Sequence, residues 1–392
     1  MSNDYVLSPF CFIKKQNDGF LIGTLFDVEK SIHIKSISEI NPNITEINNS
    51  IFIKKEDLSY YKKSCFDRLE MSYFSQKVQL GYIDTTTVCP YKCRMCPKYK
   101  FTLDRSQKEL DLESFENIIM QLKHQAGIEL HLFGDPFYDD NIYKKIYSAN
   151  KNGIFPSFST NLVSLNKVNM QNLINLKIDH LTISLDAISV PIFNKTRGHI
   201  TKSEIDNCLE LLKNILSKNS SSNFIKQVVL QSICLTTNKN ERIKVKDLAN
   251  YFQCAYYEKN YISFPSNDND IGEVPLFHSD EKLFLYDLIG AQTPFRCLKA
   301  WNRKEMAIMS DGALVPCCLM YNDTAKIGNI KKCTLKDLQE GEKAKTFRKQ
   351  IWNSYYCGEI CKLCTQNKVK YSHSAISNEL ISSLKKYCIS SW

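Results

Sequence analysis

The 392-residue sequence predicts an α/β protein built around a partial (β/α)6 TIM-like barrel, with a small N-terminal β-rich module and a C-terminal cysteine-rich extension. From Lys77 onward, short apolar runs alternate with amphipathic segments, as in βα units around a parallel sheet. About six such strands are too few for the eight of a closed barrel. The clustered cysteines form two groups, one after the first of these strands and one near the C-terminus.

Residues 1–76 are predicted to form the separate β-rich module. Runs of apolar and β-branched residues alternate there with turn residues, and Asn17, Asp18 and Gly19 form the clearest turn. The predicted strands are Phe10–Lys15, Gly19–Leu25, Ser31–Ile37 and Ser50–Lys54.

Residues 77–265 are predicted to form the barrel, because strand-like runs recur between segments with apolar residues at helical spacing. The predicted strands are Val78–Ile83, Ile128–Phe133, Pro156–Ser159, His180–Ser184, Phe224–Leu235 and Ala255–Phe264. The predicted helices are Leu112–His124, Asp140–Asn152, Lys202–Leu216 and Arg242–Phe252.

The remaining chain divides into three predicted parts. A polar stretch starting at Ser266 opens a linker with a helix. In the cysteine-rich part, a turn at residues 310–312 predicts a hairpin of Ala307–Met309 and Ala313–Val315, followed by a helix over Lys336–Arg348. The boundaries are 266–296 for the linker, 297–366 for the cysteine-rich domain and 367–392 for a tail.

The composition excludes several classes of protein. A hydrophobic content of 43% argues against disorder. No apolar run reaches the roughly 18 residues of a membrane span, and the first residues lack the pattern of a signal peptide. The net charge of +9 comes with scattered lysine pairs rather than one basic stretch. We therefore expect a cytoplasmic protein without a membrane partner, and the sequence does not favour binding of nucleic acid.

Cys89, Cys93 and Cys96 form a Cys-x3-Cys-x2-Cys motif directly after the first predicted barrel strand. Zinc sites usually draw four ligands from two paired knuckles, so three close thiolates suit zinc poorly. Three thiolates instead suit an iron–sulfur cluster in which one iron remains open to a substrate or cosubstrate. The motif therefore predicts a catalytic cluster rather than a closed structural site.

This motif resembles the signature of the radical S-adenosylmethionine (SAM) superfamily. The resemblance implies that the three thiolates hold a 4Fe-4S cluster that binds SAM. An external one-electron reductant of the flavodoxin or ferredoxin class would drive SAM cleavage to a 5′-deoxyadenosyl radical, which abstracts hydrogen from substrate. Met95 is a departure, because the family often has an aromatic residue at that position.

The resemblance continues at the ends of the later strands. Gly134, Asp135 and Pro136 stand where the family has Gly-Gly-Glu-Pro, although Phe133 replaces the first glycine. Arg197 resembles the arginine that clamps the SAM carboxylate, a task suited to a planar donor. The cofactor-binding residues that the resemblance implies are Gly134, Asp135, Ser159, Asn161, Ser184, Asp186 and Arg197.

The second cysteine group could supply the four thiolates of a closed cluster, or of a structural zinc site. Its spacing resembles the SPASM and twitch extensions of radical SAM enzymes, including an Asp-Gly-x3-Pro-Cys stretch that ends at Cys317. The longer C-terminal cysteine series of a full SPASM domain is missing, so the resemblance implies one auxiliary 4Fe-4S cluster. Cys318 and Cys357 stay unassigned. The implied ligands are Cys297, Cys317, Cys361 and Cys364.

Members of the family with auxiliary clusters act on several kinds of substrate. We favour a peptide or protein maturase for ribosomally made peptides, because edge strands of the N-terminal module could hold a leader peptide by strand addition. The alternatives are a dehydrogenase or epimerase of a sugar or aminocyclitol, and a non-catalytic iron–sulfur protein. The sequence identifies no catalytic acid or base.

Overall fold

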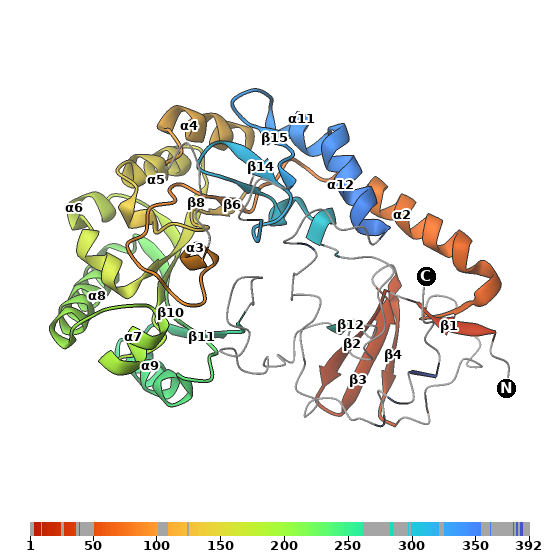
Figure 1. Cartoon of the computed structure of the whole chain (residues 1–392), viewed down its shortest axis with the longest axis horizontal. Helices are drawn as coiled ribbons and strands as arrows, with labels where there is room; N and C mark the ends of the chain where they lie inside the picture. The colour runs from red at the N-terminus through yellow and green to blue at the C-terminus, as the bar shows by residue number, and fades with distance from the viewer. Residues whose placement is uncertain are drawn as a thin grey trace.

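The computed structural model describes most of the chain, in three sheets with helices around them (Figure 1). The described residues are 4–8, 10–24, 27–36, 39, 51–100, 109–123, 125–261, 283–284, 297, 299–320, 325–353, 361, 379, 382 and 385–386. Cys357 and Cys364, two residues of the second cysteine group, lie outside them.

Six parallel strands form the barrel, in the order β11-β10-β9-β8-β7-β6. Sheet pairing confirms the predicted open barrel, and the main difference is that the first two strands are shorter than predicted. The strands are β6 (Tyr82–Ile83), β7 (Gly127–Glu129), β8 (Phe155–Asn161), β9 (Ile178–Ser184), β10 (Ile225–Ile233) and β11 (Ala255–Lys259). Residues 262–264, predicted to continue the last strand, lie outside the described residues.

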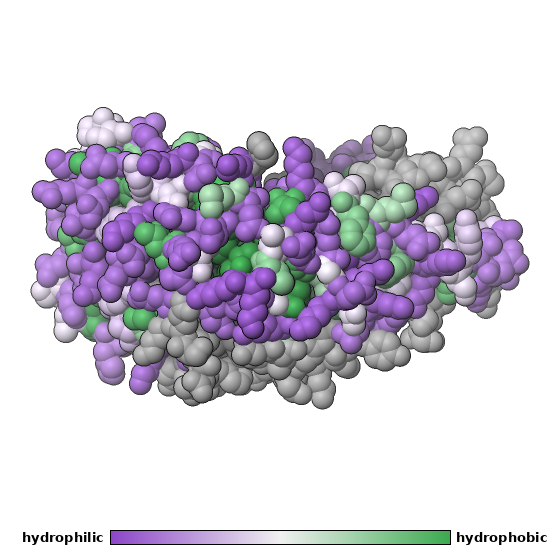
Figure 2. Space-filling view, turned by 90° about the horizontal axis from the view of Figure 1, so that it is seen from above, coloured by the Kyte–Doolittle hydropathy of each residue, from purple (hydrophilic) through white to green (hydrophobic). Residues whose placement is uncertain are grey.

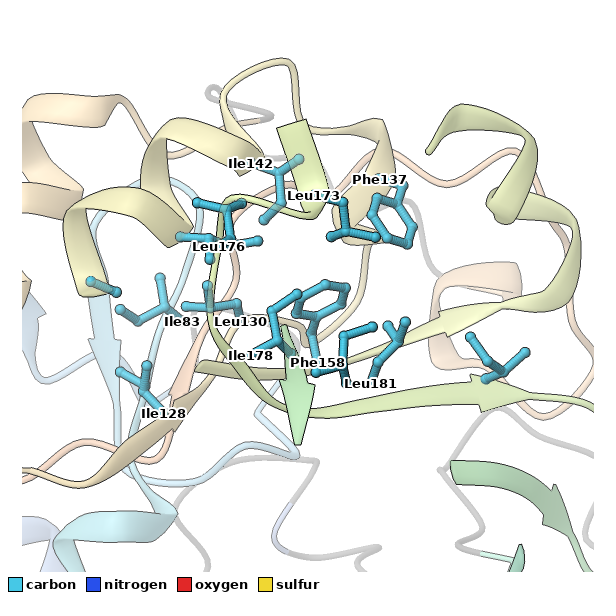
Figure 3. Packing of buried hydrophobic residues seen from close by; sticks show 14 of the residues in the cluster. Ile83, Ile128, Leu130, Phe137, Ile142, Phe158, Leu173, Leu176, Ile178 and Leu181 are labelled. Atoms are coloured by element: carbon cyan, nitrogen blue, oxygen red, sulfur yellow. The ribbon is translucent and has the colours of Figure 1, made fainter. Parts of the chain in front are cut away.

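The barrel helices cover one face of this sheet and bury its main apolar core. Figure 3 shows Ile128, Phe158 and Leu181, from three neighbouring strands, packed in one cluster with Ile142 and Leu173 from the helices. The alternation of strand side chains therefore leaves the opposite face for polar groups. The helices are α4 (Leu112–Gln121), α5 (Ile142–Lys151), α6 (Met170–Leu173), α7 (Val190–Thr196), α8 (Lys202–Ser222) and α9 (Lys239–Tyr251).

The strands predicted for the N-terminal module form, in two small sheets that also include a short first strand and a strand from residues 283–284 of the predicted linker. One sheet has the order β12-β2-β3-β4 and the other pairs β1 with β5. Their bounds are β1 (Tyr5–Leu7), β2 (Cys11–Gln16), β3 (Gly19–Thr24), β4 (Asp27–Ile34), β5 (Phe52–Lys54) and β12 (Leu283–Phe284). The rest of the predicted linker, with its predicted helix, lies outside the described residues.

The module also contains a helix that the sequence-based prediction lacks, α2 (Leu58–Ser75). Tyr61, Cys65, Leu69 and Tyr73 recur at every fourth position and pack in a second apolar cluster. This spacing is the pattern of a helix face, so the sequence did contain a signal for α2.

The predicted C-terminal hairpin forms, with β13 (Ala307–Ile308) paired to β14 (Ala313–Val315) and then to β15 (Gly328–Asn329). The structure adds that β13 runs parallel to β6, which makes the hairpin a continuation of the barrel sheet. The predicted single helix is two helices, α11 (Leu335–Glu340) and α12 (Glu342–Trp352). Gly341 separates them, and a Cβ there would press against the carbonyl oxygen of Asp337.

A buried polar cluster joins α2 to the C-terminal helices, which lie side by side in Figure 1. Arg348 donates from Nε and a terminal amino group to the two carboxylate oxygens of Glu70, at 3.1 and 3.2 Å. Arg303 donates to the carbonyl oxygen of Tyr73 at 3.0 Å and to Glu340 at 3.1 Å. These contacts attach the N-terminal module to the region of the second cysteine group.

Figure 2 shows that described residues on one face of the molecule are mostly hydrophilic, with hydrophobic residues in small groups. Among the described helices, none combines the length and apolar character needed to span a bilayer.

Candidate active site

The predicted site residues lie at the carboxyl ends of the barrel strands, which meet at one edge of a parallel sheet. The loop with Cys89, Cys93 and Cys96 follows β6, and Gly134 and Asp135 lie beyond β7. The other predicted cofactor-binding residues end β8, follow β9 or follow α7. The fold therefore gathers segments that are more than a hundred residues apart in the sequence.

The cysteine loop is attached to the end of α7. The backbone N–H of Arg94 donates to the carbonyl oxygen of Thr196 at 3.0 Å, and Cys93 Sγ lies 3.7 Å from the carbonyl oxygen of Arg197. Lys98 Nζ donates to the carbonyl oxygens of Thr87 and Cys89. These contacts fix the path of the loop.

The thiols in this loop are buried enough to resist ionisation on their own. Burial raises the pKa of Cys89 to about 11 and the pKa of Cys93 to about 12, and the neighbouring cation of Arg197 opposes the second shift. Negative charge on Cys89 and Cys96 would raise the pKa of Cys93 further, because like charges repel each other. Such a set needs a strongly cationic partner to hold it as thiolates.

Three thiolates in one loop are the donor set of an iron–sulfur cluster. In the described part of the chain, no three Cys, His, Asp or Glu side chains converge closely enough for one ion. An iron–sulfur cluster is larger than one ion and takes thiolate ligands from separated positions. The cysteines that the structure describes form no disulfides with one another.

Gly134 lies against the start of the cysteine loop. A Cβ at this position would overlap the carbonyl oxygen of Thr86, so only glycine allows the two backbones to approach this closely. The next backbone N–H, that of Asp135, donates to the carbonyl oxygen of Val88 at 2.9 Å. The Gly-Asp-Pro segment therefore supports the loop that carries the three cysteines.

The carboxylate of Asp135 is buried and already accepts several hydrogen bonds. Donors include the hydroxyl of Thr160 at 2.9 Å, the backbone N–H of Asn161 at 3.0 Å and the hydroxyl of Ser164 at 2.8 Å. Burial is the largest influence on the pKa of Asp135 and raises it despite these bonds. A SAM amino group at Asp135 would have to share oxygen atoms with these donors.

Ser159 and Ser184 are the predicted residues that stay available to a ligand. Both are half-buried, and neither hydroxyl makes a hydrogen bond to another residue that the structure describes. Asn161 pairs with Ser184 in the parallel register, but its own amide donates to Asp135 at 2.9 Å. The site thus combines free hydroxyls with a closed polar network.

Asp186 and Arg197 contact each other through one edge of the guanidinium. Arg197 Nε lies 2.6 Å from Asp186 Oδ2, and both side chains are buried. The other carboxylate oxygen of Asp186 accepts the backbone N–H of Ile233 at 2.7 Å. Asp186 therefore joins the ends of β9 and β10 beside the cysteine loop.

Sequence reasoning missed Asn238, whose amide donates to the carbonyl oxygens of Asp186 and Ile233 at 3.0 and 2.9 Å. Asn238 follows β10 as Asn161 ends β8, so an asparagine at the carboxyl end of a strand was the signal available in the sequence. The contacts of Thr160 and Ser164 with Asp135 could not be predicted, because only the fold brings these hydroxyls to that carboxylate.

Three cysteines of the second group pack against the same apolar cluster. Cys297, Cys317 and Cys361 contact the cluster that contains Trp301 and Trp352. Backbone N–H groups donate to two of the sulfur atoms, from Lys299 to Cys297 at 3.3 Å and from Leu319 to Cys317 at 3.5 Å. Donors of this kind stabilise negative charge on cluster sulfurs.

Two family models match this chain. The model described as the radical SAM superfamily matches residues 83–226, which contain the first cysteine group. The SPASM model, described as an iron-sulfur cluster-binding domain, matches residues 297–365, which contain the second group. Both matches confirm the resemblance seen in the sequence, and the second favours iron over zinc.

Relatives and solved structures are similar at low identity. The PqqA peptide cyclase of Rhizobium meliloti (strain 1021) is 20% identical over 309 residues, covering 74% of this chain and 80% of the relative. Streptococcus suis SuiB bound to precursor peptide SuiA matches with a TM-score of 0.54 at 14% identity, over 93% of this chain and 94% of that chain. Native anSMEcpe with bound AdoMet matches with a TM-score of 0.50 at 15% identity, over 79% of this chain and 96% of that chain.

Proposed function

This chain belongs to the radical SAM superfamily and carries a C-terminal SPASM domain, and from that premise we propose that it matures a ribosomally made peptide. The observation that carries the proposal is the similarity to two PqqA peptide cyclases, from Rhizobium meliloti and Bradyrhizobium diazoefficiens. Membership of this enzyme superfamily leaves no support for the non-catalytic alternative.

The N-terminal module supports a peptide substrate. The fold likeness to SuiB extends over 93% of this chain, so it includes this module. Strand β4 pairs only with β3 among the strands that the structure describes, which leaves one edge of the sheet for an added strand. A leader peptide adding beside β4 would gain backbone hydrogen bonds without requiring a deep pocket.

The residues present suit two clusters and SAM. When bound, the first cluster supplies the electron that cleaves SAM to the radical. The hydroxyls of Ser159 and Ser184 would bind polar groups of SAM, while the apolar core behind the strands keeps the sheet rigid. The cysteines that would hold the SAM-binding cluster are Cys89, Cys93 and Cys96, and those for one auxiliary cluster are Cys297, Cys317, Cys361 and Cys364.

The electron itself must come from outside the chain. We propose a flavodoxin or ferredoxin as its source, because both classes deliver single electrons at low potential. The second cysteine group would hold the auxiliary cluster, whose chemistry would supply the electron acceptor that a net oxidation of the peptide requires.

The test is anaerobic reconstitution with iron and sulfide, followed by SAM, dithionite and synthetic versions of short peptides encoded beside the gene. We expect 5′-deoxyadenosine together with a peptide that has lost hydrogen, measured by mass spectrometry. The control is the variant in which alanine replaces Cys89, Cys93 and Cys96, which should form neither product.

Two outcomes would overturn parts of the proposal. Formation of 5′-deoxyadenosine by the triple variant would refute the role of the first cysteine group. Oxidation of aminocyclitols or sugars with no change in any peptide would instead establish the small-molecule alternative.

A further inference from the structure

We propose that Asp186 is a positioning residue that holds Arg197 by its Nε side, so that the two terminal amino groups of the guanidinium face the carboxylate of SAM. This inference rests on the proposed function, because it concerns the same SAM-binding site. It replaces the sequence-based prediction that Asp186 itself contacts SAM.

The ion pair is deeply buried and held by charge. Arg197 Nε and Asp186 Oδ2 lie 2.6 Å apart, with side-chain exposures of 9% and 0%. Attraction between the opposite charges, which burial strengthens, holds the pair. A fully buried carboxylate such as that of Asp186 cannot reach a ligand directly.

The remainder of the guanidinium is available. Apart from Asp186, no residue in the described ranges forms an ion pair or side-chain hydrogen bond with Arg197. An arginine has five N–H donors, and a buried arginine with unused donors loses free energy unless a ligand accepts them. Because Asp186 contacts only Nε, the two terminal amino groups of Arg197 remain, and their geometry matches the two oxygens of a carboxylate.

The location of Arg197 favours a ligand that also reaches the first cluster. The carbonyl oxygen of Arg197 is 3.7 Å from Cys93 Sγ, and the preceding carbonyl accepts the N–H of Arg94. A carboxylate bound by Arg197 would therefore lie beside the cysteine loop. If Asp186 also faced the ligand, its negative charge would repel the ligand carboxylate. Its contact with the Nε side of Arg197 avoids this repulsion.

The test variant is Asp186→Asn. Asparagine keeps an oxygen that can accept the N–H of Ile233, so the link between β9 and β10 is retained while the negative charge beside Arg197 is removed. The holoenzyme is reduced with dithionite and titrated with SAM, and with decarboxylated SAM, while the EPR spectrum of the cluster is recorded. We expect the dissociation constant for SAM to rise about tenfold or more, with little change for decarboxylated SAM.

The matched control is Asp206→Asn, which makes the same chemical change in an exposed ion pair with Lys202. It should leave both dissociation constants unchanged. Arg197→Lys provides a second test. Lysine keeps the positive charge, but its single ammonium group cannot bind Asp186 on one side and present two amino groups to a ligand on the other. This variant should lose the preference for SAM over decarboxylated SAM, even if Asp186→Asn does not fold.

Three results bear on the outcome in different ways. Unchanged SAM affinity in Asp186→Asn with full iron content would overturn the inference. An equal loss for both ligands would also overturn it, because it would show a structural role only. A wild-type protein that binds SAM with the expected preference but forms no 5′-deoxyadenosine would leave the inference standing and refute the proposed function.

Discussion

The guanidinium carbon of Arg348 lies 3.7 Å from the centre of the Tyr73 ring, and that of Arg303 lies 4.7 Å from the same ring. Tyr73 belongs to α2 and Arg348 to α12, so this contact joins the N-terminal module to the SPASM region. Glu70 supplies the carboxylate that pairs with Arg348. The charge of this buried arginine is thus balanced from another part of the chain.

Replacing Glu70 by glutamine should strongly destabilise the protein. The change leaves Arg348 buried without a charged partner, which costs about 3 kcal/mol in comparable sites. Urea unfolding of both proteins measures the difference in free energy. Asp206→Asn, in an exposed pair, should cost no more than about 1 kcal/mol. A similar small loss in both variants would show that the buried pair contributes little.

Replacing Cys361 and Cys364 by alanine should remove one cluster and spare the other. Iron should fall from about eight to about four atoms per chain, while 5′-deoxyadenosine still forms from SAM. Iron analysis and chromatography measure the two quantities. Cys333→Ser, at an exposed cysteine, is the control and should keep all the iron. Unchanged iron in the double variant would contradict the assignment of these ligands.

Alanine at Gly134 should disturb the first cluster without touching any ligand. The new Cβ would collide with the backbone of Thr86, and the cysteine loop would have to move. We expect less iron bound after reconstitution than in wild type. Gly127→Ala is the control, because its Cβ would meet one carbonyl oxygen, that of Phe155, at 3.2 Å. Normal iron binding by Gly134→Ala would show that the loop can adapt.

Glu204 should stabilise the start of α8 in a pH-dependent way. Hydrogen bonds from the backbone N–H and hydroxyl of Thr201 hold its pKa below the ordinary value of 4.5. A carboxylate with a lowered pKa stabilises the fold above its unfolded pKa, and this contribution is lost as pH falls through the folded pKa. The difference in melting temperature between wild type and Glu204→Gln should therefore shrink from about pH 7 to about pH 3. A difference independent of pH would contradict this reasoning.

Much of the barrel could be predicted because its strands carry their own signal. In β9, Leu181 and Ile183 are buried and alternate with the half-buried polar residues Thr182 and Ser184, and this period of two defines a strand with one buried face. Strand β6 has two residues and is defined mainly by its neighbours, so its length could not be read from local pattern. The break at Gly341 depends on contact with the preceding turn, which an apolar pattern does not report.

The cysteine positions could likewise be predicted, because ligand spacing is a property of the chain itself. The hydrogen bonds of Asp135 could not be predicted, because its donors Thr160 and Ser164 are more than twenty residues away and reach it only through the fold. The same holds for Asp186, whose partner Arg197 lies beyond a helix. Sequence motifs therefore nominate candidate residues, but which of their side chains remain free for a ligand depends on tertiary contacts.

The pairing of β13 with β6 has a consequence for synthesis on the ribosome. The first barrel strand has β7 on one side, but its other neighbour is Ala307–Ile308, encoded far downstream. A nascent chain therefore carries an uncovered edge beside the cysteine loop until most of the polypeptide has emerged. The first barrel strand gains its second neighbour only when this late hairpin has been synthesised and has closed that edge.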